Sequence, residues 1–212
     1  MKILLVDKDG TITKPIDGRF TNTPDNQEPI GGAYEFLERF SLMGYSIAVV
    51  SNQGGVGAGH KSLEDATAEM RRMLDLFPMV DIACFCPDKP IPKWLRWIPI
   101  VQWFRSQCHV VSRTGGDYPL DFHLFDEDFI LAGGKSRHAV FRKPGALMLW
   151  CAVHDQVRHS SRLADVENLV MVGDRPEDYL ASHHYPFECS FISASAIPIF
   201  NKFSLLEHGI GH

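Results

Sequence analysis

The sequence has no hydrophobic run of the roughly 18 residues that a membrane-spanning helix requires. Its most apolar stretch, residues 94–104, is interrupted by Arg96, Pro99 and Gln102. The N-terminal apolar run meets a charge at Asp7 and is too short for a secretory signal peptide. The five cysteines are odd in number and do not make the paired pattern of a disulfide framework. We therefore expect a cytoplasmic protein with reduced thiols and no membrane partner.

The chain also lacks a strong excess of one charge sign. Its 21 basic and 26 acidic residues give a formal net charge of −5, which excludes a global attraction to nucleic acid but leaves room for local basic patches. Hydrophobic residues make up 45% of the sequence, enough for a substantial core. No internal repeat divides the chain, and 212 residues fit a single domain spanning residues 1–212.

Short apolar runs alternate with segments of helical periodicity. Strands are expected at residues 3–6, 45–50, 80–86, 169–172 and 189–192, and helices at residues 30–43, 61–77, 145–157 and 177–182. This alternation predicts an α/β fold of the Rossmann-like, doubly wound type, with a mainly parallel sheet covered by helices on both faces. Residues 87–142 have no such periodicity, and residues 87–140 are expected to form an inserted, cap-like segment.

Polar side chains follow the expected strands. Asp7 and Asp9 come directly after the first strand, and Gly10 permits a turn that would let both carboxylates approach one hard cation such as Mg²⁺. Ser51 and Asp174 likewise follow strands, at the edge where reactive groups gather in such folds. Each of these segments, taken alone, is also typical of an ordinary solvated turn.

Lys143 completes the pattern. It stands just before a helix whose start is fixed by Pro144, where its ammonium could neutralise phosphoryl charge. On its own it would be an ordinary surface cation. A further acid, Asp178, follows Asp174 by four residues. The joint order of these groups along the chain is far more specific than any one of them.

With these four pieces in this order, the sequence resembles the haloacid dehalogenase-like phosphohydrolase superfamily. The resemblance implies a phosphatase in which Asp7 attacks phosphorus and Asp9 acts as general acid and then general base. It implies that Ser51 and Lys143 hold the phosphoryl group. The implied ligands of Mg²⁺ are Asp7, the Asp9 carbonyl oxygen and Asp174. Asp178 would act through a water molecule or by contacting the residues that bind the ion. Substrate contacts are expected from Gly10, Thr11, Asn52 and Arg142.

Residues 51–54 and 142–145 are similar to one subgroup. It contains histidinol-phosphate phosphatases, heptose bisphosphate phosphatases and the 3′-phosphatase domain of polynucleotide kinase/phosphatases. Several members carry a zinc loop, of whose ligands only Cys86 remains here, so we expect no structural zinc. Cys84 and Cys86 could bind a metal, but two buried core thiols are the simpler interpretation.

Residues 89–113 mix cations with tryptophans. This composition suits a strand of nucleic acid, and it equally suits a small cap with its tryptophans packed inward. The basic members include Lys93, Arg96, Arg105, His109 and Arg113, and the tryptophans are Trp94, Trp97 and Trp103.

A small phosphorylated metabolite is therefore the expected substrate, with a polynucleotide 3′-phosphatase as the alternative. A phosphotransferase and a catalytically silent binding protein on the same fold remain as further hypotheses. No motif sets the oligomeric state or the role of residues 194–212.

Overall fold

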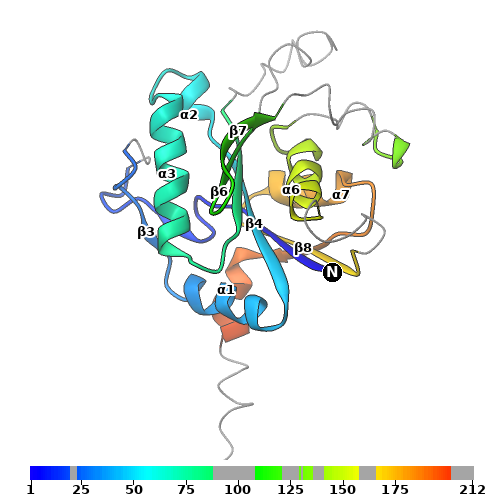
Figure 1. Cartoon of the computed structure of the whole chain (residues 1–212). Helices are drawn as coiled ribbons and strands as arrows, with labels where there is room; N and C mark the ends of the chain where they lie inside the picture. The colour runs from blue at the N-terminus through cyan, green and yellow to red at the C-terminus, as the bar shows by residue number, and fades with distance from the viewer. Residues whose placement is uncertain are drawn as a thin grey trace, which may run out of the picture.

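A computed structural model describes residues 1–19, 23–87, 108–120, 129, 131–135, 141–157 and 166–201. The main sheet contains β1 (Lys2–Val6), β4 (Tyr45–Asn52), β5 (Ile82–Cys86), β6 (Cys108–Ser112), β7 (Gly116–Leu120), β8 (Asn168–Gly173) and β9 (Ser190–Ser193). Their spatial order is β7-β6-β5-β4-β1-β8-β9, and the five strands from β5 to β9 in this order are parallel (Figure 1). The predicted Rossmann-like α/β fold is confirmed.

The helices cover both faces of the sheet. They are α1 (Ala33–Leu42), α2 (Gly54–Gly57), α3 (Leu63–Leu76), α6 (Leu147–Val157) and α7 (Pro176–His184), with a 3₁₀ turn, η5 (Ala194–Ala196), near the end of the described chain. A small antiparallel pair, β2 (Thr13–Lys14) and β3 (Glu28–Pro29), interrupts the loop expected over residues 8–29.

Strand β1 is buried on both faces, which explains why its sequence is continuously apolar and does not alternate with polar residues. Leu4 and Val6 pack with α1 and α3 on one face, whereas Ile3 and Leu5 pack with α6 on the other. A strand buried on both faces needs apolar residues at every position. The connection from β1 to β4 runs through α1, on the face of Leu4 and Val6, whereas the connection from β8 to β9 runs through α7, on the opposite face. The connections that leave the neighbouring strands β1 and β8 therefore diverge at their carboxyl ends. In open α/β sheets this divergence opens the crevice where ligands bind.

The expectation that residues 87–142 are irregular is wrong for residues 108–120. Strands β6 and β7 form an antiparallel hairpin that extends the sheet from β5. Cys108 and Val110 face the core cluster shared with α6, and Gly116 turns the chain with a φ of 81°. The hairpin is therefore part of the core. The three tryptophans and the cations of residues 89–107 lie outside the described residues.

The two described members of the basic segment make internal contacts instead of forming a cationic face. The ring of His109 stacks on Phe85 with centroids 5.5 Å apart, and burial lowers its pKa. The Arg113 guanidinium donates to the carbonyls of Leu74, Phe77 (3.1 Å) and Val80 (3.1 Å), at and just beyond the end of α3. Arg113 thus satisfies carbonyls that a helix end leaves without intrahelical partners.

Cys84 and Cys86 are buried in the core, as predicted for thiols that pack as small hydrophobic groups. Within the described ranges, no helix combines the length and the apolar character needed to cross a bilayer.

Replacing Arg113 by Ala should lower the free energy of unfolding by about 1–2 kcal/mol, because the α3 carbonyls lose charged hydrogen-bond donors. Urea unfolding followed by circular dichroism measures this. Arg71→Ala is the matched control, since its guanidinium makes a half-exposed ion pair with Asp117 and should cost less than about 1 kcal/mol. Equal losses for the two variants would contradict the assigned role of Arg113.

Candidate functional site

The predicted polar residues meet at the carboxyl ends of β1, β4 and β8. Val6 lies opposite Val49 and Val172 in the parallel register, so the chain leaves the sheet at the same level on all three strands. Asp7 still donates its backbone N–H to the Val172 carbonyl at 2.8 Å. Ser51 was expected directly after the strand but lies within β4, which ends at Asn52, whereas Asp174 follows β8 directly.

Lys143 is the centre of this cluster. It comes from the loop before α6, and its side chain is 2% exposed. The ammonium donates to Asp7 Oδ1 at 2.6 Å, to Asp178 Oδ1 at 2.5 Å and to the Val50 carbonyl at 2.8 Å. All three ammonium hydrogens therefore have acceptors, which a buried lysine needs in order to stay charged.

Asp7 is buried beneath the surface of the site. Burial raises its pKa to about 6, because the loss of solvation outweighs the opposing charge of Lys143. The nearby negative charge of Asp178 adds to the upward shift. Near neutral pH most of the Asp7 side chains are therefore carboxylates, held in one orientation by Lys143.

Asp174 faces Asp7 across the Thr11 hydroxyl. Thr11 Oγ1 lies 3.4 Å from Asp7 Oδ2 and 3.4 Å from Asp174 Oδ1. Gly10 has a φ of 90°, and a Cβ there would come within 2.5 Å of Asp174 Oδ2. Gly10 is therefore required for backbone conformation and for space beside Asp174.

Asp178 closes the cluster from the first turn of α7. Its Oδ2 accepts the Arg175 backbone N–H at 3.0 Å, while its Oδ1 binds Lys143. Gly173 leaves the space for this carboxylate, since a Cβ at residue 173 would overlap it. The carboxylate oxygens of Asp7, Asp174 and Asp178 approach within 4.8 Å of one another, a separation that could hold a metal ion.

The Asp9 carboxylate has different neighbours. Its Oδ1 accepts from Lys8 Nζ at 2.6 Å, and its Oδ2 accepts from Gln53 Nε2 at 2.8 Å. Burial acts to raise the pKa of Asp9, but the charge and hydrogen bond of Lys8 outweigh it and the net shift is downward. With 36% of its side chain exposed, Asp9 can still meet a substrate.

Ser51 and Asn52 are positioned by hydrogen bonds of different kinds. Ser51 Oγ accepts from Gln53 Nε2 at 2.8 Å, which leaves its own hydroxyl hydrogen to donate elsewhere. Asn52 pairs with the backbone of Lys143, accepting from its N–H at 2.9 Å and donating to its carbonyl at 3.1 Å. Asn52 thus anchors the Lys143 backbone, and its contact with a substrate stays a prediction. Arg142 is half-buried beside Lys143.

The sequence reasoning missed several buried polar residues beside this cluster. Lys8 is fully buried and pairs with Glu69 of α3, which in turn pairs with Lys61. The sequence pattern of α3 did contain a sign of this pairing. Glu69 shares the inward face of α3 with Ala66, Met70 and Met73, and an acid among apolar positions needs a buried partner.

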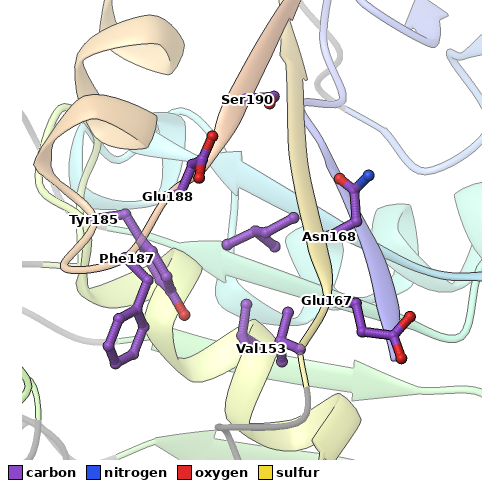
Figure 2. Close-up of a pocket in the computed structure, with 9 residues that line it drawn as sticks. Val153, Glu167, Asn168, Tyr185, Phe187, Glu188 and Ser190 are labelled. Atoms are coloured by element: carbon purple, nitrogen blue, oxygen red, sulfur yellow. The ribbon is translucent and has the colours of Figure 1, made fainter.

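A separate cavity of about 520 Å³ lies at the opposite edge of the sheet (Figure 2). It is lined at the amino end of β8 by Asn168 and Leu169, and beyond α7 by Tyr185 and Phe187. Since the carboxylates gather at the carboxyl end of β8, this cavity is not part of the site.

Comparison with known proteins identifies the family. The family described as "Polynucleotide kinase 3 phosphatase" matches residues 2–192. The chain belongs to this family. The resemblance to the haloacid dehalogenase-like phosphatases, and to this subgroup of them, is confirmed.

Curated relatives include heptose bisphosphate phosphatases. A probable D-glycero-D-manno-heptose-1,7-bisphosphate 7-phosphatase of Thermoplasma acidophilum is 32% identical over 42% of this chain and 58% of its own length. The D-glycero-beta-D-manno-heptose-1,7-bisphosphate 7-phosphatase of Pseudomonas aeruginosa is 30% identical over 42% of this chain and 51% of its own length. The matched part therefore spans little more than half of each relative.

Solved structures share the fold at low identity. A D,D-heptose 1,7-bisphosphate phosphatase from B. bronchiseptica, complexed with magnesium and phosphate, superposes with a TM-score of 0.53 at 20% identity. The match covers 90% of this chain and 79% of that one. A putative HAD-like phosphatase from Mesorhizobium loti gives a TM-score of 0.50 at 18% identity, covering 88% and 69%.

Replacing Lys143 by Met should destabilise the metal-free protein by about 3–5 kcal/mol at about pH 8, because Asp7 and Asp178 remain buried without their cation. Losing the lysine removes the charge that lowers the pKa of Asp7, so this pKa rises further. Stability from a raised carboxyl pKa is present below the unfolded pKa and is lost as pH rises through the folded one, so the deficit should shrink toward about pH 5.

Urea unfolding in a metal chelator at both pH values measures this. Lys14→Met is the control, because Lys14 makes an exposed pair with Glu28. A pH-independent deficit in Lys143→Met would contradict the electrostatic account.

Proposed function

We propose that this protein is a phosphatase that hydrolyses a phosphate monoester of a small metabolite through an aspartyl-phosphate on Asp7. The observation that carries the proposal is the arrangement of Asp7, Lys143 and Asp174. A carboxylate is oriented by a buried ammonium on one side and faces a second carboxylate on the other, at the crevice edge of the sheet. Such a carboxylate can act as a nucleophile once the repulsion between it and a phosphate is cancelled.

The three-carboxylate cluster fits Mg²⁺. Asp7, Asp174 and Asp178 carry three negative charges when ionised, and Lys143 offsets only one of them. Both Asp178 oxygens accept close hydrogen bonds, at 2.5 and 3.0 Å. Among the described residues, Asp7 Oδ2 and Asp174 Oδ1 meet only the Thr11 hydroxyl, at 3.4 Å, so Asp7 and Asp174 would bind the ion directly, with the Asp9 carbonyl. Asp178 would act through Lys143 or through water. When bound, Mg²⁺ would neutralise charge on the phosphoryl oxygens.

In the first step the Asp7 carboxylate forms a bond to phosphorus as the ester P–O bond breaks. Lys143 holds the carboxylate in place, and the Ser51 hydroxyl donates to a phosphoryl oxygen. Asp9, which must first take up a proton from solvent as the anionic substrate binds beside it, transfers that proton to the departing ester oxygen, which leaves as an alcohol. Phosphoryl transfer of this kind needs chiefly positioning and charge stabilisation.

In the second step Asp9 acts as a base. It takes a proton from a water molecule, whose oxygen attacks phosphorus as the bond to Asp7 breaks. Phosphate leaves, Asp9 gives its proton to solvent, and both carboxyl groups return to their starting states. The lowered pKa of Asp9 in the described structure suits this second role, and general acid–base help is typically worth about 10²–10⁴-fold.

A sugar-like phosphate is favoured as the substrate because the curated relatives act on a heptose bisphosphate. A nucleic-acid 3′-phosphate is the second candidate, supported by the description of the family. His109 and Arg113 do not favour it, because both are engaged inside the fold. A silent binding protein is disfavoured, because all the residues needed for both steps are present.

Asp7→Asn should reduce phosphate release more than about 10³-fold with the fold intact, because an amide cannot attack phosphorus. Phosphate release with Mg²⁺ would be measured on D-glycero-D-manno-heptose-1,7-bisphosphate, other sugar phosphates, histidinol phosphate and a 3′-phosphorylated oligonucleotide. Asp75→Asn, at an exposed carboxylate on α3, should retain full activity. Near-normal turnover by folded Asp7→Asn would refute the nucleophile, and selective turnover of the oligonucleotide would decide for the second candidate.

Mg²⁺ binding should release protons at about pH 6 but not at about pH 8. With its pKa at about 6, Asp7 is about half protonated at the lower pH and must lose that proton to become a ligand. Titration calorimetry in two buffers of different ionisation enthalpy counts the protons released, expected near 0.5 per ion at about pH 6. Asp7→Asn should abolish the pH-dependent part; an unchanged release in that variant would exclude Asp7 as its source.

A further inference from the structure

Five side chains form a closed ring beside the nucleophile. Glu69 Oε1 accepts from Lys8 Nζ at 2.5 Å and Glu69 Oε2 accepts from Lys61 Nζ at 2.5 Å. Lys8 also donates to Asp9 Oδ1, and Lys61 donates to Gln53 Oε1 at 2.5 Å. Gln53 closes the ring by donating to Asp9 Oδ2.

Most of this ring is buried. The side chains of Lys8, Glu69 and Lys61 are 0%, 1% and 5% exposed, whereas that of Asp9 is 36% exposed. Two lysines balance two carboxylates, so the ring is neutral overall. Burying four charges is costly unless each has close partners of opposite sign. The ring meets that condition only because Glu69 bridges the two lysines.

The ring determines which way the Gln53 amide faces. Since Lys61 is a donor only, it must meet the amide oxygen, and the amide nitrogen is then turned toward Asp9 and Ser51. Glu69 thus reaches both oxygens of Asp9, through Lys8 on one side and through Lys61 and Gln53 on the other. It touches neither the expected substrate nor any reacting atom.

We propose that Glu69 is a positioning residue that holds Asp9 in the orientation for proton transfer to the leaving group. The proposal rests on the proposed function, in which Asp9 protonates the ester oxygen. A residue that acts only on Asp9 should matter most for esters whose leaving groups need a proton. It should matter little for esters whose leaving group departs as a stable anion.

The test compares kcat for phenyl phosphate and p-nitrophenyl phosphate, using the full chain with Mg²⁺. Glu69→Gln preserves shape, but its single amide oxygen can serve only one of the two lysines. We expect kcat for phenyl phosphate to fall about 10–100-fold and kcat for p-nitrophenyl phosphate to fall less than about 3-fold. Asp9→Asn should show the same preference with a larger loss.

Two further variants support the comparison. Lys61→Met removes the contacts of Lys61 with Gln53 and with Glu69 Oε2 but leaves the Glu69–Lys8 pair, so it tests the proposal even where Glu69→Gln fails to fold. It should shift the ratio of the two kcat values in the same direction. Glu64→Gln is the control, because it makes the same chemical change at an exposed position of α3, and its ratio should equal that of the unaltered protein.

An unchanged ratio in folded Glu69→Gln and Lys61→Met, with the unaltered protein active, would overturn this inference alone. Equal losses on the two esters would do the same, because they indicate general disruption of the site. No turnover of either ester by the unaltered protein would overturn the proposed function, and this inference with it.

Discussion

The Lys143 ammonium is buried and donates hydrogen bonds to Asp7, to Asp178 and to the Val50 carbonyl. The rest of the site follows from the need to keep that charge satisfied. Asn52 makes two hydrogen bonds with the Lys143 backbone, and Gly173 leaves room for the Asp178 carboxylate. An ammonium with all its hydrogens engaged cannot move without leaving a buried carboxylate unpaired, which is a large penalty. The Asp7 carboxylate, which we propose as the nucleophile, is therefore oriented before any substrate arrives.

Two charged networks lie side by side and differ in their balance. The ring around Glu69 is neutral and largely closed to solvent, so it needs no ligand to complete it. The cluster around Lys143 keeps an excess of negative charge at the edge of the crevice, with Asp174 partly exposed. That imbalance is what a divalent cation would remove. Asp9 belongs to the first network, and its negative charge acts on Asp7 of the second, which suits the proton transfer that we propose for it.

The sequence was most informative where local pattern and tertiary role coincide. The apolar run of β1 predicts a strand buried on both faces, and the acids that follow β1 and β8 predict where the crevice lies. The order of Asp7, Lys143 and Asp174 along the chain was sufficient to predict that they belong to one site. The β6–β7 hairpin was missed because its residues, such as Pro119 and His109, do not alternate clearly. The ring around Glu69 depends on contacts between residues up to 61 positions apart, and a single sequence does not show pairing at that distance.

The central claim is that Asp7 becomes phosphorylated during turnover. Stereochemistry at phosphorus tests it without requiring the intermediate to accumulate. Phenyl phosphorothioate, made chiral at phosphorus with two oxygen isotopes, would be hydrolysed in water labelled with the third, and the configuration of the released thiophosphate determined. Two successive displacements, by Asp7 and then by water, predict retention of configuration. Inversion would show that water attacks the substrate directly, and would contradict the account.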